Sequence, residues 1–318
     1  MRFPLAIRDD AEFDAVGFGT NAVDFLISVP HYPDFNSKVE LTGYIQAAGG
    51  EAASTMAGLR RLGLAVSYIG RFGDDQSGRF GLDSLIAEGV NVEYAEQVAG
   101  AATQIAFIVI DERSGERTVI WKRDAKLAFN ADEAPIEAVS RCRLLHLTPH
   151  DVRACVQMAG AARKAGVIVS ADIDNVFQGI DELLPLVDIL VMSADFPGRF
   201  LGIEDKRASL VEIEQRYGPA LVGITLGDEG SLLYCGKEFI ETPGFAVPGG
   251  CMDTTGAGDA FRAGLIWGIL QGEAVASAAR YANAVAALKC RAVGARTALP
   301  TVSELVELAG PPVNAAGR

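Results

Sequence analysis

The sequence is poor in histidine, cysteine and basic side chains, and each scarcity narrows the possible functions. Three histidines in 318 residues are too few for a zinc site built from histidine. Five cysteines, an odd number without a Cys-x-x-Cys pair, predict reduced and mostly buried thiols, and they favour a cytoplasmic location. Lysine and arginine total 28 against 41 aspartate and glutamate, so the net charge of −13 argues against a nucleic-acid-binding or anionic-membrane surface.

Long apolar runs are also missing. No run reaches the roughly 18 residues of a membrane-spanning helix, and the amino terminus lacks the continuous apolar stretch of a signal peptide. Apolar residues nevertheless make up 49% of the chain. We therefore expect one large α/β core rather than a disordered chain.

The segment 253–259, with the sequence DTTGAGD, is the most informative part of the chain. It precedes an apolar run at 260–270, which predicts a buried helix that begins near Asp259. The first N–H groups of a helix have no partner within it, so this junction can bind an anion, and Gly256 and Gly258 leave room for one. A carboxylate beside a bound phosphate is unfavourable unless it has a task, such as accepting a proton from an attacking hydroxyl. The alternative for Asp259 is an ordinary helix cap.

Along the chain, short apolar runs alternate with helix-like stretches. Continuous apolar runs of this length are typical of strands covered on both faces, so we expect a mostly parallel sheet with ligands at the carboxyl ends of its strands. The expected strands are 14–19, 66–69, 144–147, 167–171, 189–192 and 221–226, and the expected helices are 52–62, 77–88, 151–164, 210–216 and 275–289.

Two segments, 23–46 and 103–121, interrupt that alternation, because polar and apolar residues alternate in them around turn signals. This pattern predicts half-exposed hairpin strands, which we interpret as one small discontinuous β domain. The stretch 17–22, GFGTNA, fits the dinucleotide fingerprint Gly-x-Gly-x-x-Gly/Ala. No helix is expected after it, so a dehydrogenase is disfavoured.

Two motifs together resemble the signatures of the ribokinase-like (PfkB) carbohydrate kinases. Residues 49–63, GGEAASTMAGLRRLG, are similar to the family's amino-terminal signature, and DTTGAGD is similar to its carboxy-terminal one. The resemblance covers nearly the whole chain and implies a three-layer α/β/α sandwich with a mostly parallel central sheet. It divides the chain into an α/β catalytic domain (1–21, 48–98 and 123–318) and a β lid (22–47 and 99–122) that could supply a homodimer contact.

The resemblance also assigns roles to individual residues. Asp259 would be the catalytic base, and the backbone of Gly256, Ala257 and Gly258 would form the anion hole. Contacts with the sugar fall on Asp24, Gly49, Gly50, Ser54, Thr148 and Asp259, and contacts with ATP fall on Thr225, Gly227, Gly230, Asn283, Gly256 and Gly258. A carboxylate accepts hydrogen bonds from sugar hydroxyls, and a diglycine lets the backbone approach a sugar closely. Ser54 is shorter than the asparagine that relatives often carry, which leaves the identity of the sugar open.

Metal ions are implied in two places. Mg²⁺ is expected to accompany ATP, and Asp195 would help to bind it. Many relatives have Asn-x-x-Glu in this segment, and Asp195 lies one position before the place of their glutamate. Ser193 in that segment makes the chain resemble the ketohexokinase-type branch. Asp253, with Thr255 and Gly294, would bind a monovalent cation such as K⁺ behind the anion hole.

The function that follows is phosphorylation of a primary hydroxyl of a small sugar by MgATP, with fructose or a related ketose favoured and ribose next. Two alternatives stay open, a nucleoside kinase of the same fold and a noncatalytic sugar-binding regulator. The intact anion hole and Asp259 argue against the regulator.

Overall fold

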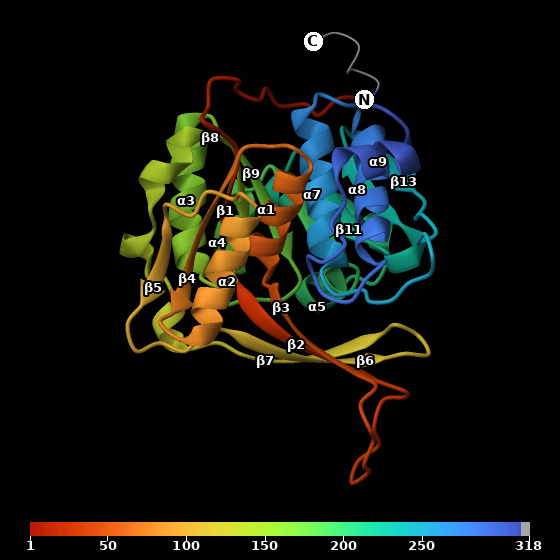
Figure 1. The fold of residues 1–318 in the computed structure, drawn as a ribbon. Helices are drawn as coiled ribbons and strands as arrows, with labels where there is room; N and C mark the ends of the chain where they lie inside the picture. Colours follow the sequence, from red (N-terminus) through yellow and green to blue (C-terminus); the bar gives the residue numbers. More distant parts are fainter. Residues whose placement is uncertain (313–318) are drawn as a thin grey trace.

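The computed structural model describes residues 1–312 and contains a central nine-stranded sheet between two layers of helices, with a second, four-stranded sheet at one edge of the molecule (Figure 1). The central sheet has the order β13-β12-β11-β10-β9-β8-β1-β4-β5. All neighbouring pairs are parallel except β11 with β12 and β12 with β13. Its strands are β1 Phe13–Phe18, β4 Val66–Gly73, β5 Ala95–Val98, β8 Cys142–Leu147, β9 Ile168–Ile173, β10 Ile189–Ser193, β11 Leu221–Thr225, β12 Ser231–Cys235 and β13 Glu238–Thr242.

Helices cover both faces of the central sheet. Consecutive residues of a strand point to opposite faces and therefore belong to different hydrophobic cores. Leu144 of β8, for example, belongs to one core and its neighbour Leu145 to the other. The helices of the first face are α1 Glu51–Arg61, α2 Gln76–Ala87, α7 Ala257–Leu270, α8 Val275–Lys289 and α9 Val302–Ala309. Those of the second face are α3 Val152–Ala165, α4 Ile180–Leu183, α5 Phe196–Leu201 and α6 Lys206–Tyr217. Short 3₁₀ helices occupy 125–127, 131–133, 136–141, 184–186 and 227–229.

Local sequence signals account for several helix ends. Asp75 accepts a hydrogen bond from the Gly78 N–H at 2.7 Å at the start of α2, and Thr301 with Glu304 forms a capping box at the start of α9. Gly166, with a φ of 68°, ends α3 in the left-handed conformation that glycine adopts easily. Among residues 1–312, none of the helices has the length and apolar character needed to span a membrane.

The second sheet has the order β3-β2-β6-β7 and forms what we call the lid. Its strands are β2 Ala22–Val29, β3 Gly43–Gly49, β6 Ile105–Asp111 and β7 Arg117–Lys122. They lie in or beside the two segments that the sequence analysis assigned to the lid, although the domain boundaries themselves stay a prediction. Because β1 is followed by β2 and not by a helix, the structure lacks the dinucleotide-binding turn that GFGTNA could have indicated.

The fold agrees with the expected mostly parallel α/β sheet, and every expected strand and helix is present within a few residues. Three short helices, α4, α5 and α9, and the antiparallel hairpin of β12 and β13 were not foreseen as such elements. Short helices carry too few periodic positions to be recognised from sequence.

Helices α7 and α8 pack closely because small residues face each other between them. A Cβ added to Gly264 would lie 2.7 Å from the Cα of Ala282, and one added to Gly268 would lie 2.7 Å from the Cα of Ala278. Both neighbours are backbone atoms, so the helices could accept a side chain only by moving apart. All of residues 260–270 are buried.

We therefore expect Gly264→Ala to lower the free energy of unfolding by about 1–3 kcal/mol, through overpacking against α8. Gly160→Ala is the matched control, because Gly160 lies within α3 and has no atom within 4 Å of the added Cβ. This control should raise stability by up to about 1 kcal/mol, since alanine is the better helix former. Urea unfolding measures both, and equal effects of the two substitutions would contradict close packing of α7 on α8.

Candidate active site

The candidate site lies where the carboxyl ends of the parallel strands meet the beginnings of helices α1 and α7. Asp172 lies near the end of β9, Ser193 ends β10, and Thr225 ends β11. Two helices start beside this edge, α1 at Glu51 and α7 at Ala257. Their contact includes a hydrogen bond of 3.4 Å from the Thr55 hydroxyl to the Asp259 carbonyl. The two sequence motifs, far apart in the chain, are therefore neighbours in the fold.

The turn before α7 has the geometry of an anion site. Gly256 has a φ of 76°, and a Cβ there would lie 2.8 Å from the Cα of Ala295, so only glycine fits. In the described chain, no side chain caps the start of α7. The Ala257 N–H donates to the Thr254 carbonyl at 3.1 Å. The other N–H groups of the first turn, including that of Gly258, remain available to an anion, and the helix dipole favours a negative charge there.

Asp253 lies at the other end of this turn and is fully buried. Its Oδ1 accepts hydrogen bonds from the Thr255 N–H at 2.8 Å and the Thr255 hydroxyl at 2.7 Å, and its Oδ2 accepts one from the Gly294 N–H at 2.8 Å. Lys289, which is also fully buried, donates to the Asp253 carbonyl at 2.8 Å. These bonds fix the conformation of the segment that leads into the anion site.

Asp259, in the first turn of α7, is surrounded by other charges. Burial, and after it the carboxylate of Asp172, raise the pKa of Asp259 above the usual aspartate range, and Arg262 opposes the shift. Arg262 forms an ion pair of 2.5 Å with Asp172 and donates to the Val191 carbonyl at 3.3 Å. A carboxylate with a raised pKa is a stronger proton acceptor, which suits a general base.

The predicted sugar contacts also come together. Asp24 on β2 is only 4% exposed, and burial raises its pKa to about 6 against the opposing charge of Arg296. A Cβ on Gly49 would clash with the Asp24 carboxylate, at 2.6 Å from its Cγ, and one on Gly50 would lie 2.6 Å from the backbone carbon of Asn21. The diglycine is thus required by close approach of β2 to the start of α1.

Arg296 is a site residue that sequence reasoning missed. It is buried, and its guanidinium donates to the Ser54 hydroxyl at 3.2 Å, to the Ser84 hydroxyl at 3.2 Å and to the Gly49 carbonyl. It fixes the diglycine and occupies space beside the short side chain of Ser54. No local pattern around Arg296 indicates this contact, which joins residues 242 positions apart.

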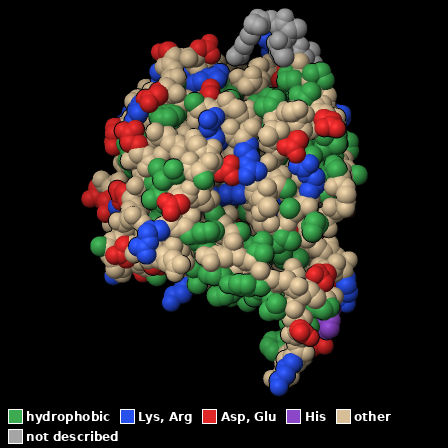
Figure 2. Space-filling view, viewed as in Figure 1, with side chains coloured by type: hydrophobic (Ala, Val, Ile, Leu, Met, Phe, Trp, Pro, Cys, Tyr) green, Lys and Arg blue, Asp and Glu red, His purple; other side chains and the backbone are tan. Residues whose placement is uncertain are grey.

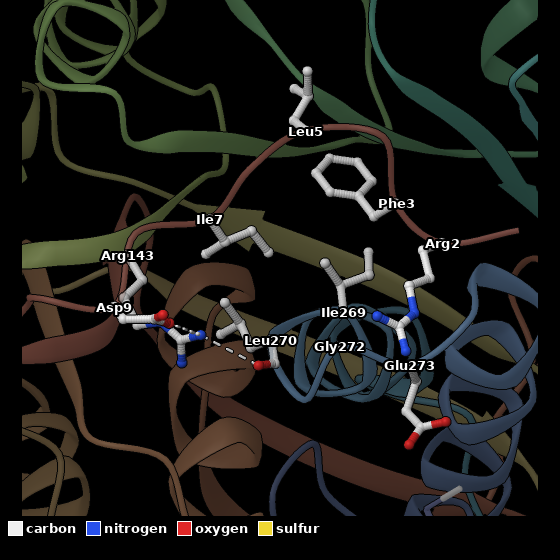
Figure 3. A pocket seen from close by; sticks show the side chains of 10 residues that line it. All are labelled: Arg2, Phe3, Leu5, Ile7, Asp9, Arg143, Ile269, Leu270, Gly272 and Glu273. Carbon is white, nitrogen blue, oxygen red and sulfur yellow. Dashed lines mark hydrogen bonds and ion pairs between the residues drawn. The ribbon is translucent and has the colours of Figure 1, made fainter. Parts of the chain in front are cut away.

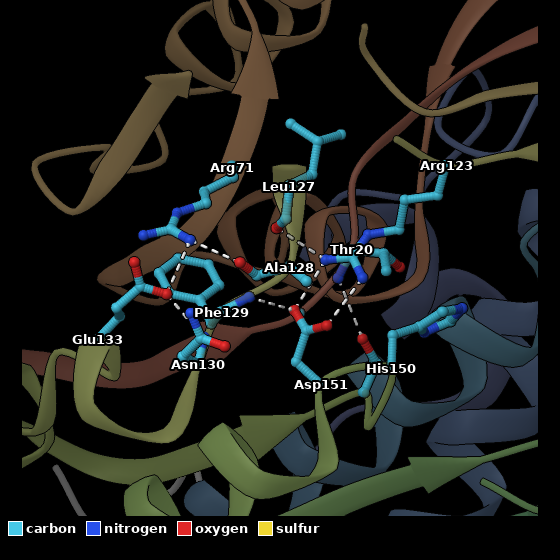
Figure 4. Close-up of polar contacts among 12 residues, drawn as sticks. Thr20, Arg71, Arg123, Leu127, Ala128, Phe129, Asn130, Glu133, His150 and Asp151 are labelled. Atoms are coloured by element: carbon cyan, nitrogen blue, oxygen red, sulfur yellow. Dashed lines mark hydrogen bonds and ion pairs between the residues drawn. The ribbon is translucent and has the colours of Figure 1, made fainter. Parts of the chain in front are cut away.

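Thr148 and Arg123 lie at the ends of strands that border the site. The hydroxyl of Thr148, a predicted sugar contact just after β8, accepts a hydrogen bond from the Thr20 N–H at 3.3 Å. Arg123, just after β7, forms ion-pair bonds of 2.8 and 2.7 Å with Asp151 and donates to the Leu127 carbonyl at 2.9 Å (Figure 4). Arg123 therefore attaches the end of the lid to the central domain.

An aromatic wall, which the sequence analysis did not anticipate, stands beside the diglycine. It consists of Trp121 on β7, His150 after β8 and Phe177 after β9. The ring centroids of Trp121 and His150 are 6.0 Å apart, and those of His150 and Phe177 are 4.9 Å apart. The Nδ1 atom of His150 is 3.7 Å from Oε2 of Glu51, the first residue of α1. The wall therefore borders the predicted sugar site.

On the predicted nucleotide side, Thr225 ends β11 and the following turn requires its glycines. Gly227 and Gly230 have φ values of 63° and 105°, and a Cβ on Gly230 would lie 2.5 Å from the Gly244 nitrogen. Asn283 on α8 is buried and donates its side-chain amide to the Ser231 hydroxyl at 3.1 Å and the Thr242 carbonyl at 3.2 Å. Asn283 thus holds the β12–β13 hairpin against α8. Its contact with ATP stays a prediction.

The residues around the expected Mg²⁺ position fit that ion only in part. Asp195 is exposed and forms an ion pair of 3.0 Å with Arg199, which lies outside the turn before α7. The Ser193 hydroxyl is buried and has no hydrogen-bond partner among the described residues, which suits a contact with a water ligand of Mg²⁺. Within the described chain, no group of three or more histidine, cysteine, aspartate or glutamate side chains could bind a metal ion.

A separate surface hollow of about 240 Å³ lies near the carboxyl end of α7, between the amino-terminal segment and the α7–α8 connection (Figure 3). Its lining includes Phe3, Ile7 and Leu270. Helix α7 has 14 residues, so the hollow lies about 20 Å from the start of the helix. It is not part of the site described above.

Most of the chain is similar to known carbohydrate and nucleoside kinases. The family described as "pfkB family carbohydrate kinase" matches residues 18–302. A nucleoside kinase of Methanothermobacter thermautotrophicus is 27% identical over 92% of this chain and 94% of its own, and Fructokinase-2 of Oryza sativa subsp. japonica is 29% identical over 92% and 93%. The structure of Arabidopsis thaliana ribokinase complexed with ribose and ATP is similar with a TM-score of 0.78 and 24% identity, over 93% of this chain and 98% of that one.

Proposed function

Because this chain belongs to the pfkB family of carbohydrate kinases, and is thus a phosphotransferase that acts on an alcohol group, we propose that it transfers the γ-phosphoryl group of MgATP to a primary hydroxyl of a small sugar. The observation that carries the proposal is the position of Asp259. Its carboxylate lies in the first turn of α7, next to the Gly256 and Gly258 N–H groups, at a helix start that no side chain caps. A proton acceptor and an anion site are therefore adjacent, as a direct transfer requires.

Each part of the site has a task in this reaction. Asp259 accepts the proton of the attacking hydroxyl while the N–H groups at the start of α7 stabilise the negative charge on the phosphoryl group in transit. Mg²⁺, when bound with ATP, neutralises charge on the phosphates. Asp24 orients the sugar by accepting hydrogen bonds from its hydroxyls, and Arg296 holds the diglycine on which the sugar rests.

Among sugars, fructose or a related ketose is favoured and ribose comes next. The rice fructokinase supports the former, and the bound ribose of the Arabidopsis structure supports the latter. Asp24 and Arg296 are both nearly inaccessible, at 4% and 6% exposure, which is consistent with a compact polar acceptor.

A nucleoside is the second candidate acceptor, and the aromatic wall is the observation that favours it. Trp121 is 52% exposed, so one face of its indole remains free to stack on a planar base. The similarity to the Methanothermobacter nucleoside kinase points the same way. A noncatalytic sugar-binding regulator is the least consistent alternative, because it would need neither Asp259 nor the uncapped helix start.

The lid contacts the turn before the anion site and also borders the acceptor side of the site. Arg117 on β7 donates to the Thr254 hydroxyl at 2.6 Å, so the lid contacts the turn that leads into the anion site. The same strand ends near Trp121 at the acceptor side. A lid in this position excludes water from the phosphoryl group and so suppresses hydrolysis of ATP.

The outer face of the lid is apolar and supports a homodimer. Phe25 stacks on Tyr44 and on Phe107, with centroid distances of 6.4 and 5.2 Å. Tyr44, Phe107 and Ile120 are 56, 43 and 58% exposed. Hydrophobic side chains accordingly gather along the lid in the lower part of the space-filling view (Figure 2). A second copy of the lid is the occupant that would cover such a flat sheet face.

The first prediction about function concerns Asp259. We expect Asp259→Asn to lower kcat by about 10²- to 10⁴-fold with little change in acceptor affinity, because the amide cannot accept the proton. Asp132→Asn, at an exposed position, is the matched control. Since the base must be ionised and its pKa is raised, wild-type kcat/KM should fall with decreasing pH well before pH about 4, where an ordinary aspartate becomes protonated. Near-normal turnover of Asp259→Asn would exclude the assignment of Asp259 as the base.

The second prediction concerns the acceptor. In a panel of free sugars and nucleosides with ADP formation as the readout, we expect the highest kcat/KM with fructose or a related ketose. If a nucleoside is preferred instead, Trp121→Ala should raise its KM about tenfold or more through lost stacking, and change the KM of free sugars less. If a sugar raises the melting temperature but no acceptor supports ADP formation, the kinase proposal fails and the noncatalytic sugar-binding regulator is favoured.

The third prediction concerns assembly. The wild-type protein should have twice the 33.5 kDa mass of one chain when measured by light scattering. Ile120→Gln should shift the population to the monomer without lowering the melting temperature of the monomer fold, because the side chain is 58% exposed on the lid. Ile86→Gln, at another exposed apolar position, serves as the control. A wild-type monomer at micromolar concentration would exclude this dimer.

A further inference from the structure

The residues expected to bind a monovalent cation do not fit such an ion. Asp253, Thr255 and Gly294 were assigned to it, and all three are buried close together. The polar atoms of this group are already engaged with one another. Both carboxylate oxygens of Asp253 accept hydrogen bonds, from Thr255 at 2.7 and 2.8 Å and from the Gly294 N–H at 2.8 Å. A carboxylate saturated by donors offers little to a further cation.

A cation of the chain itself is present at this place. Lys289 is the last residue of α8, and its side chain has no exposed surface. Its ammonium donates to the Asp253 carbonyl at 2.8 Å and lies 3.8 Å from Oδ2 of the same residue. A free K⁺ bound to these oxygens would lie against the ammonium, where repulsion between like charges opposes it.

Packing alone does not account for a lysine at this position. Burying an ammonium is unfavourable unless it is paired and hydrogen-bonded, and an apolar side chain of similar volume would fill the same space without that cost. Here the charge contacts the first residue of the DTTGAGD turn, and Arg117 reaches the Thr254 hydroxyl from the lid. Positive charge is therefore concentrated around the segment that presents the anion site.

We propose that the ammonium of Lys289 is the fixed cation of this turn and takes the place of a monovalent metal ion, so that the enzyme works without K⁺. Lys289 is a positioning residue, because it acts through the backbone of Asp253 and does not contact the reacting atoms. It holds the turn in shape and adds to the positive potential at the start of α7. The inference rests on the proposed phosphoryl transfer at this turn.

The experiment compares KCl with tetramethylammonium chloride at equal ionic strength, for the wild type and for Lys289→Ala, Lys289→Met and Lys289→Arg. Turnover of the wild type should be the same within about twofold in the two salts. Lys289→Ala, which leaves room for an ion, should lose about 10²-fold in kcat in tetramethylammonium chloride, as expected for a weakened anion site, and should recover about tenfold or more in KCl. Lys289→Met, which fills the space without charge, should lose activity and show no recovery. Lys289→Arg should retain more turnover than Lys289→Met.

Melting temperatures, measured without ATP or acceptor, give a second readout. Only Lys289→Ala should be stabilised selectively by K⁺, since binding to the folded state alone raises apparent stability. Lys164→Ala, an exposed lysine near the end of α3, is the control and should behave as the wild type. Selective activation or stabilisation of the wild type by K⁺, or full activity of Lys289→Met, would overturn the proposal.

The response of the wild type to K⁺ and the melting temperatures test the proposal even if the variants do not fold or no acceptor is found. If the Lys289 variants fail to fold, the response of the wild type to K⁺ still decides the question. If no acceptor supports ADP formation, the proposed phosphoryl transfer fails, whereas the melting temperatures still show whether a K⁺ site exists in the wild type or only in Lys289→Ala.

Discussion

The close packing of α7 against α8 is the interaction on which the site depends. The two helices approach each other through Gly264 and Gly268, whose hydrogens face the backbone of α8. Because of this approach, the beginning of α7 and the end of α8 meet at the same turn. Asp259 enters the site from the first helix, and Lys289 supports the turn from the second. The geometry proposed for catalysis is thus a consequence of helix packing in the core.

Buried charge imposes the second constraint, because every ionised group removed from water needs a partner. Asp172 is paired with Arg262, the Asp253 carbonyl and carboxylate lie beside Lys289, and Arg296 opposes the shift in the pKa of Asp24. Each of these cations is matched by a carboxylate, so the attraction for an anion comes from the start of α7, which no side chain caps, and from Arg117 beside Thr254.

Sequence patterns predicted the sheet, the main helices and the two motifs because these depend on local periodicity and on glycines required by a turn. Gly256 and Gly50 illustrate this, since each has a positive φ at a close backbone approach. Arg296, Lys289 and the aromatic wall could not be predicted in the same way. Their neighbours come from distant segments, and an arginine or lysine near the end of a helix is most often a solvated residue. Lys289 even falls at the position where helix dipoles favour exposed cations, so only its burial distinguishes it.

Strand β7 would give the lid a direct part in the proposed reaction. Arg117 and Trp121 are four residues apart, so on an extended strand their side chains lie on the same face and about 13 Å apart. Arg117 contacts Thr254 in the turn before the anion site, and Trp121 contacts His150 beside the acceptor. One strand therefore contacts both the turn before the anion site and the wall beside the predicted sugar site. Movement of the lid would change both contacts together, and in the proposed phosphoryl transfer a closed lid would therefore favour the reaction.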